Sequence, residues 1–251
     1  MAIFKTILMI SICVVFYFPS TIFCSPSLLT LPVPGPEALA FDIKGRGPYT
    51  GVSDGRVLKY DGSRIGFATT LIPLQIGKSK AICDGTHDIA LAPICGRPLG
   101  LGFYYRTGEL YIADAFLGLF VVGRNGGRAT QLATSAGRVP FRFLDGLEVD
   151  QLTGTVYFTD ASAIYGLSQI NELISSGDAT GRLLKYDSRT RKVTVLSISK
   201  DGTYLLSFRV CQPENSYWLK GPSANEAEII LNLKGNPDNI ERTVRGDFWV
   251  A

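Results

Sequence analysis

A short sequence unit that recurs along the chain limits the folds that it can adopt. The unit is clearest at residues 141–160, where an apolar segment ending at Val149 is followed by a Thr-Gly turn and a second apolar segment. A close copy covers residues 99–114, and looser copies begin near residues 38, 198 and 244. Each copy has the form of two short antiparallel strands joined by a glycine-containing turn. Spacing of about 40–60 residues is typical of a β-propeller, whose blades are four-stranded sheets.

A second internal repeat points to the same architecture. The phrase GRVLKYD at residues 55–61 returns almost unchanged as GRLLKYD at residues 181–187, and Asp-Gly turns flank the first copy. Helical periodicity is confined to residues 168–175, where about two turns are predicted, and the proline-rich residues 25–36 are predicted to be extended. The fold class is therefore expected to be all-β. Hydrophobic residues make up 46% of the 251 residues, which is enough for a packed core.

The first 24 residues have the pattern of a secretory signal peptide. Lys5 precedes an apolar run at residues 7–18, and small or polar residues then lead to Cys24 and Ser25. The run is shorter than the roughly 20 residues that span a bilayer. We expect residues 1–24 to be removed and residues 25–251 to form the propeller domain, with no membrane attachment after cleavage. An uncleaved membrane anchor is the alternative.

The cysteines and the net charge indicate the kind of compartment and the classes of partner to expect. The secretory route is oxidising, so Cys83 and Cys95, which bracket a polar loop, are expected to form a disulfide that stabilises the fold by roughly 3 kcal/mol. The alternative is two free thiols, and Cys211 has no obvious partner. The net charge of +3 is scattered along the chain, which argues against a nucleic-acid partner.

Ten phrases are spread along the chain: GPEALAFD (35–42), YTGVSDGRVLKYDG (49–62), CGRPLGLGF (95–103), LYIADAFLGL (110–119), ATQLAT (129–134), DQLTGTVYFTDAS (150–162), ATGRLLKYD (179–187), SKDGTYLL (199–206), YWLKGP (217–222) and GNPDNI (235–240). Together and in this order, they resemble the plant strictosidine synthase-like family. The resemblance implies a six-bladed β-propeller of the strictosidine synthase and gluconolactonase-like type, in the secretory pathway. The vacuole is the expected final compartment and the extracellular space the alternative. The family's founding enzyme condenses tryptamine with the aldehyde secologanin in a Pictet–Spengler reaction of alkaloid biosynthesis, without a metal or cofactor. We therefore expect a monomer that takes a small amine or aldehyde substrate and needs no cofactor.

The resemblance also implies roles for individual residues. Phe143 falls where the synthases place a pocket tryptophan, and Asp145 falls where they place a pocket tyrosine. Ile174 falls near a further apolar position of the pocket wall. These three residues are the predicted substrate-binding positions, and the change from tyrosine to Asp145 predicts substrates other than the synthase's own. Cys83 and Cys95 fall at the family's disulfide positions.

The resemblance places the family's catalytic glutamate in a last blade, after the position of Ala251. It also places roughly a dozen more residues after Leu196, including an innermost strand of about 5–6 residues. We therefore expect about five blades, assign no catalytic residue, and expect this chain to differ in activity from the founding enzyme.

Two other function classes remain open. Related six-bladed hydrolases of esterase or lactonase type hold Ca²⁺ at the ring centre, and Glu37 and Asp145 lie at comparable places. Ca²⁺ takes 6–8 oxygen ligands, so two carboxylates alone do not predict a metal site. We expect both to be polar residues that line a wet central channel. The third class is a propeller that binds a ligand without catalysis.

Several polar residues are expected to be structural. His87 is the only histidine, which argues against a zinc cluster or a Ser-His-Asp triad. Asp114 and Asp160 end equivalent strands and are predicted to accept hydrogen bonds from turn amides. Residues 123–127, GRNGG, are predicted to form a turn; they lack the lysine and the following helix of a phosphate loop.

Overall fold

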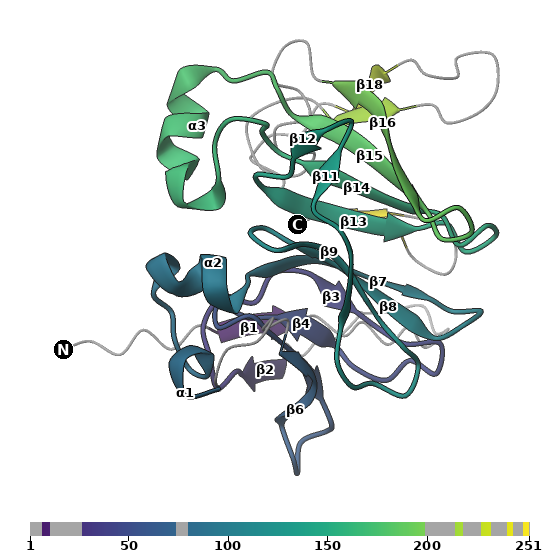
Figure 1. The fold of residues 1–251 in the computed structure, drawn as a ribbon. Helices are drawn as coiled ribbons and strands as arrows, with labels where there is room; N and C mark the ends of the chain where they lie inside the picture. Colours follow the sequence, from purple (N-terminus) through teal and green to yellow (C-terminus); the bar gives the residue numbers. More distant parts are fainter. Residues whose placement is uncertain are drawn as a thin grey trace, which may run out of the picture.

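A computed structural model of the protein describes residues 7–10, 27–73, 80–198, 214–217, 227–231, 240–242 and 248–250. Three complete four-stranded antiparallel sheets make up most of this part of the chain (Figure 1). In each sheet the strands follow one another in chain order, so that each is a simple meander. This is the arrangement of a propeller blade.

The three blades have matching strand positions. The first comprises β3 (Leu39–Ala40), β4 (Tyr49–Gly51), β5 (Arg56–Tyr60) and β6 (Phe67–Pro73). The second comprises β7 (Pro98–Tyr104), β8 (Glu109–Asp114), β9 (Gly118–Val122) and β10 (Thr130–Ala133). The third comprises β13 (Leu144–Val149), β14 (Val156–Asp160), β15 (Arg182–Asp187) and β16 (Lys192–Ile198).

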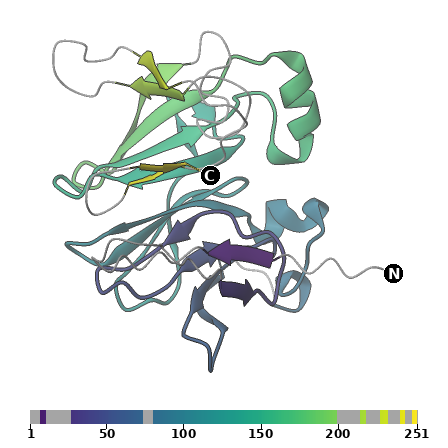
Figure 2. The ribbon, with the colours of Figure 1, turned by 180° about the vertical axis from the view of Figure 1, so that it is seen from behind.

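The remaining elements are short. Four two-stranded pairs are β1 (Ile7–Ile10) with β2 (Ser27–Thr30), β11 (Ser135–Ala136) with β12 (Val139–Pro140), β17 (Glu214–Tyr217) with β18 (Ala227–Leu231), and β19 (Ile240–Arg242) with β20 (Phe248–Val250). The helices are α1 (Lys80–Cys83), η1 (Ile89–Leu91), α2 (Ala92–Cys95), η2 (Leu167–Gln169) and α3 (Ile170–Ser176). The α-helices all lie at one end of the blades, as Figures 1 and 2 show from opposite sides. No helix among the described residues is long and apolar enough to cross a membrane.

The all-β propeller prediction is confirmed in detail for the first three blades. Their innermost strands β3, β7 and β13 begin where the first three repeat copies begin, and the two GR-x-LKYD phrases form β5 and β15, the third strand of each blade. The helix expected at residues 168–175 forms as η2 and α3. Six blades in total remains a prediction.

One repeat boundary is corrected. The unit expected to begin near residue 198 does not start there, because Ser197 and Ile198 pair with Leu183 and Arg182 as the end of β16. These residues complete the outermost strand of the third blade, since their backbone groups are bonded to β15. The phrase at residues 199–206 lies outside the described residues, as do Cys211 and most of the expected signal peptide.

The hydrophobic core lies between consecutive blades. One cluster fills the space between the first and second blades, and another fills the space between the second and third. Each blade is too thin to bury its apolar faces alone, so neighbouring blades supply the cover. The first cluster includes Tyr49, Val57, Leu101, Phe103, Leu110, Ile112, Phe120 and Val122, and the second includes Tyr111, Leu119, Leu144, Val149, Val156, Phe158, Leu184 and Tyr186.

The innermost strands approach each other closely. The Ala38 N–H donates to the Leu99 carbonyl across the first two blades at 3.3 Å. A Cβ on Gly100 in β7 would lie 2.3 Å from the Asp145 carbonyl oxygen and 2.8 Å from Leu147 Cβ in β13. Only a residue without a side chain fits there, because both neighbours belong to the adjacent strand.

We expect Gly100→Ala to destabilise the protein by about 1–3 kcal/mol, because β7 and β13 must separate to admit the methyl group. The measurement is urea unfolding followed by circular dichroism. Gly123→Ala is the matched control, since a Cβ at that position meets nothing within 4 Å. Equal stability of the two variants would contradict the close approach.

The connection between the first and second blades is held by a disulfide. Cys83 and Cys95 are fully buried and bonded to each other, with Cα atoms 5.4 Å apart, so the pairing expected from the sequence is present. The bond closes a loop that starts at the end of α1, contains η1 and α2, and lies at the helical end of the blades.

The double variant Cys83→Ser/Cys95→Ser should lose roughly 3 kcal/mol of unfolding free energy, the value for closing a loop of this length in the unfolded chain. Urea unfolding of both proteins with and without a reducing agent measures the loss. Reduction should lower the stability of the unmodified protein and leave the double variant unchanged. A reductant effect of equal size on both would refute the assignment.

Candidate functional site

The candidate site lies at the end of the blades where the innermost strands begin. The loops at this end connect the second strand of each blade to the third, or one blade to the next, and they carry the helices. In propellers these loops are free to vary because the sheets beneath them hold the architecture. The geometry of this end therefore depends on how each loop is attached to its blade.

A buried aspartate attaches the loops in every complete blade. Asp54, Asp114 and Asp160, called here the anchor aspartates, follow or end the second strand and have no exposed surface. Asp114 accepts hydrogen bonds from the backbone N–H groups of Phe116 and Leu117 at 2.9 and 2.8 Å, and from that of Arg97 at 2.5 Å. One carboxylate thus holds a turn and the start of β7 together, which confirms the role predicted for Asp114.

The other two anchor aspartates add an ion pair. Asp54 pairs with Arg56 at 2.5 Å and accepts from the Gly85 N–H at 2.8 Å, in the connection to the next blade. Asp160 accepts from the Phe143 N–H at 2.9 Å and pairs with the buried guanidinium of Arg182. A buried charge of this kind is stable only with such partners.

Arg182 extends the anchor of the third blade to the β11–β12 hairpin. Its guanidinium donates to the carbonyls of Ala136, Val139 and Pro140 at 3.2, 3.4 and 3.0 Å. The hairpin leads directly into Phe143, whose N–H is bonded to Asp160. The backbone position of Phe143 is consequently set by a buried charge network.

Phe143 is the first predicted substrate-binding residue, and it is fully buried. It belongs to an apolar cluster with Leu99, Ala115, Ala161 and Leu173, packed under η2 and α3. Ile174, the third predicted residue, is 49% exposed on α3, and its neighbour Leu173 joins the cluster instead. Phe143 therefore packs against α3, but the residue of α3 in this cluster is Leu173 and not the predicted Ile174.

Asp145 lies in β13 and is 6% exposed. The β13–β14 register is irregular between Leu144 and Leu147, and the Gly146 N–H donates to the Thr159 hydroxyl at 3.0 Å within this irregularity. A bulge re-aims the side chains around it. Asp145 is thus held at a point where the innermost strand departs from regular pairing, next to Gly100 of β7.

Glu37 and Asp145 lie near corresponding ends of innermost strands, with β7 between β3 and β13. Ala38 is bonded to Leu99, and Asp145 contacts the neighbouring position Gly100. In the part of the chain that the structure describes, no three His, Cys, Asp or Glu side chains gather as a metal site. His87 is exposed in the disulfide loop.

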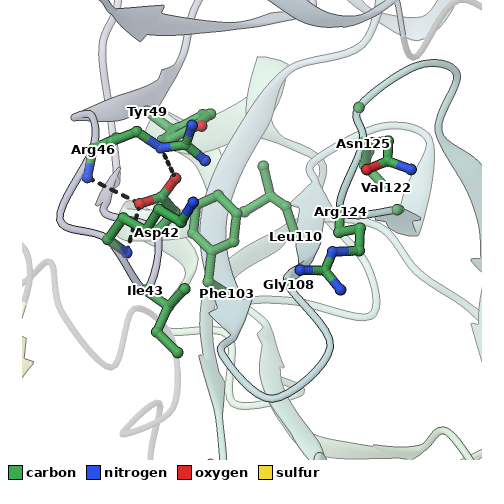
Figure 3. Close-up of a pocket in the computed structure, with 13 residues that line it drawn as sticks. Asp42, Ile43, Arg46, Tyr49, Phe103, Gly108, Leu110, Val122, Arg124 and Asn125 are labelled. Carbon is green, nitrogen blue, oxygen red and sulfur yellow. Dashed lines mark hydrogen bonds and ion pairs between the residues drawn. The ribbon is translucent and has the colours of Figure 1, made fainter.

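A cavity that the sequence did not reveal lies at the opposite end of the blades. Its volume is about 330 Å³, and its lining includes Asp42, Arg46, Phe103 and Arg124 (Figure 3). The available signals were the charged turn after β3 and the glycine-rich turn at residues 123–127. Each is an ordinary turn by itself, and only the packing of two blades places them together.

These features define an all-β propeller with polar side chains at the end where its innermost strands begin. Residues 145–222 match the family model described as strictosidine synthase. Two relatives from Arabidopsis thaliana, proteins strictosidine synthase-like 12 and 11, are 43% and 40% identical; each alignment covers 97% of this chain, and 77% and 79% of the relative. The strictosidine synthase of Catharanthus roseus is 41% identical over 86% of this chain and 64% of its own length.

The chain therefore belongs to the strictosidine synthase family. Among solved structures, a chain from a nidogen/laminin complex is similar with a TM-score of 0.46 and 13% identity, covering 70% of this chain and 53% of that one. That likeness is too distant to add to the assignment.

Asp114 makes the stability of this end dependent on pH. Burial raises its pKa to about 6, and the three backbone donors only partly offset that effect. Because the pKa of Asp114 in the folded protein lies above the ordinary value of 3.8, the protonated side chain favours the folded state. This stabilising contribution is complete below about pH 4 and is lost as pH rises through about 6.

Asp114→Asn should remove this pH-dependent contribution. Relative to the variant, the unmodified protein should therefore lose unfolding free energy as pH rises from about 4 to about 7. Urea unfolding of both proteins across this range gives the difference at each pH. A constant difference would show that Asp114 titrates alike in the folded and unfolded chains.

Proposed function

We propose that this strictosidine synthase-like protein binds a small organic amine at the end of the ring where the innermost strands begin. The observation that carries the proposal is Asp145, a nearly buried carboxylate on β13 that the resemblance places at a substrate-binding position. Family membership supports the location, since the resemblance places the synthase pocket at the same positions.

The local chemistry suits a protonated amine. A carboxylate in a poorly hydrated site favours an opposite charge within about 4–6 Å, and an apolar aromatic cluster can cover the hydrocarbon part of the ligand. Phe143 and Leu173 belong to that cluster. A neutral alcohol of the same shape lacks the positive charge that a carboxylate attracts, so amine and alcohol should differ in affinity.

The same residue argues for a reaction that differs from the founding one. Condensation of tryptamine with secologanin forms a C–N bond with loss of water, and then a C–C bond with loss of a proton. Those proton transfers need a positioned general acid and base, worth typically 10²–10⁴-fold in rate. Asp145 stands where the resemblance places a pocket tyrosine, which changes the charge and shape offered to the reactants. We infer that the chain condenses tryptamine with secologanin more slowly than the founding enzyme.

The proposal includes passage through the secretory route, with residues 1–24 as the signal peptide and the vacuole as the final compartment. The Cys83–Cys95 disulfide supports it, because such bonds persist in oxidising compartments and are rare in the cytosol.

Tryptamine binding to the purified protein, measured by calorimetry, tests the proposal. Saturable binding is expected, and Asp145→Asn should weaken it about tenfold because a charge-assisted contact is lost. The uncharged analogue tryptophol should bind the unmodified protein more weakly than tryptamine. Glu148→Gln is the control on the same strand, since Glu148 is an exposed carboxylate of β13.

A parallel assay with tryptamine and secologanin compares turnover with that of the Catharanthus roseus enzyme. Turnover near that enzyme's rate would refute the inference of altered activity. Equal affinities in Asp145→Asn and unmodified protein would refute the amine site. Bound Ca²⁺ with chelator-sensitive ester hydrolysis would favour the hydrolase alternative.

A further inference from the structure

The cavity at the opposite end of the blades is formed by two turns and the strands beneath them. The turn after β3, residues 42–46, lies on one side, and the turn after β9, residues 123–126, lies on the other. Figure 3 shows Phe103 and Leu110 between them. The cavity therefore bridges the first and second blades, and its volume of about 330 Å³ is at the small end of ligand pockets.

The inner part of the cavity is apolar and aromatic. Tyr49 and Phe103 meet edge to face, with ring centroids 5.0 Å apart, and Leu110 and Val122 are buried beside them. All four belong to the core cluster of the two blades or are packed in it. A flat apolar group can occupy such a surface with little rearrangement, because the surrounding side chains are already fixed by packing.

The Asp42 side of the rim is internally satisfied. The Asp42 carboxylate accepts from the backbone N–H groups of Lys44 and Arg46, both at 2.9 Å, and pairs with Arg46 Nε at 2.6 Å. These bonds lower the pKa of Asp42, although burial acts in the opposite direction as the largest single influence. The carboxylate is thus ionised and committed to its own turn, while the Lys44 ammonium stays exposed.

Arg124 stands across the cavity from this turn. Its guanidinium extends toward Leu110 and Gly108 in Figure 3, and it has no carboxylate partner within the described ranges. Lys44 likewise has none among the described residues. Neighbouring Lys59 and Asp61 neutralise each other. The rim therefore carries three cations, Lys44, Arg46 and Arg124, against the single carboxylate of Asp42.

We propose that this pocket binds a small aromatic carboxylate. The ring would lie against Tyr49 and Phe103, and the carboxylate would meet Arg124, whose planar guanidinium donates two parallel hydrogen bonds to such a group. A larger ligand does not fit the volume, and a cation would face the excess positive charge of the rim.

This pocket is separate from the proposed amine site. Innermost strand β7 passes from Gly100, which contacts Asp145, to Phe103, which lines the pocket. Three residues of extended strand span roughly 10 Å. Ligands at the two ends need not compete, and each proposal can fail without the other.

Titration of the full chain with trans-cinnamate, followed by ligand-observed NMR, tests the proposal. We expect saturable binding with a Kd at or below about 1 mM and much weaker binding of cinnamyl alcohol, which lacks the charge. Arg124→Gln should weaken cinnamate binding about tenfold. Because Arg124 is exposed, this substitution leaves the core intact.

Arg128→Gln is the matched control, an exposed arginine four residues away that does not line the pocket. It should bind cinnamate like the unmodified protein, and so should Asp145→Asn. Absence of saturable binding, or equal weakening by Arg124→Gln and Arg128→Gln, would overturn the pocket. Loss of cinnamate binding in Asp145→Asn alone would place the ligand at the other end.

Discussion

Each complete blade depends on a carboxylate buried at the end of its second strand. Asp54, Asp114 and Asp160 have no exposed surface, and each accepts hydrogen bonds from backbone groups of a loop or of the residue just before the first strand of the blade. Loops cannot be secured by apolar contacts alone, because their backbone N–H groups also need acceptors once they are buried. A single carboxylate can satisfy several of them.

Different partners complete the same anchor in different blades. Arg56 and Arg182 neutralise Asp54 and Asp160 directly, whereas Asp114 relies on three backbone donors and on the more distant charge of Arg97. Burial raises the pKa of Asp114 to about 6, and it also raises the pKa of Asp160 despite the ion pair with Arg182. One structural device therefore holds the loops of all three blades, and at Asp114 it adds a carboxyl group that titrates near pH 6.

The anchors and the blade contacts together position the candidate site. Asp160 holds the backbone of Phe143, and the close approach of Gly100 places β7 against Asp145. The opposite end of the same blades carries a cavity with cationic side chains. The strands that run between the two ends keep the two environments apart.

Much of this architecture could be predicted from local sequence. Alternating strands, Asp-Gly turns and the repeated GR-x-LKYD phrase gave the all-β class and the first three blade starts. The start expected near residue 198 was wrong because Ser197 and Ile198 continue an outermost strand, and a strand's place in a sheet depends on its partners. Sequence periodicity can indicate that a segment is a strand, but it does not show which neighbouring strand that segment pairs with.

The sequence by itself determined the repeat, the β class, the paired cysteines and the family. Only the tertiary structure decided that Leu173, and not Ile174, packs with Phe143, and that Arg124 faces Phe103 and the Asp42 turn across a cavity. The reason is physical: neighbours along a chain are set by covalent order, whereas contacts between blades depend on strand register and the close approach at glycines. The hydrogen bond between Ala38 and Leu99, for example, joins residues 61 positions apart in the chain.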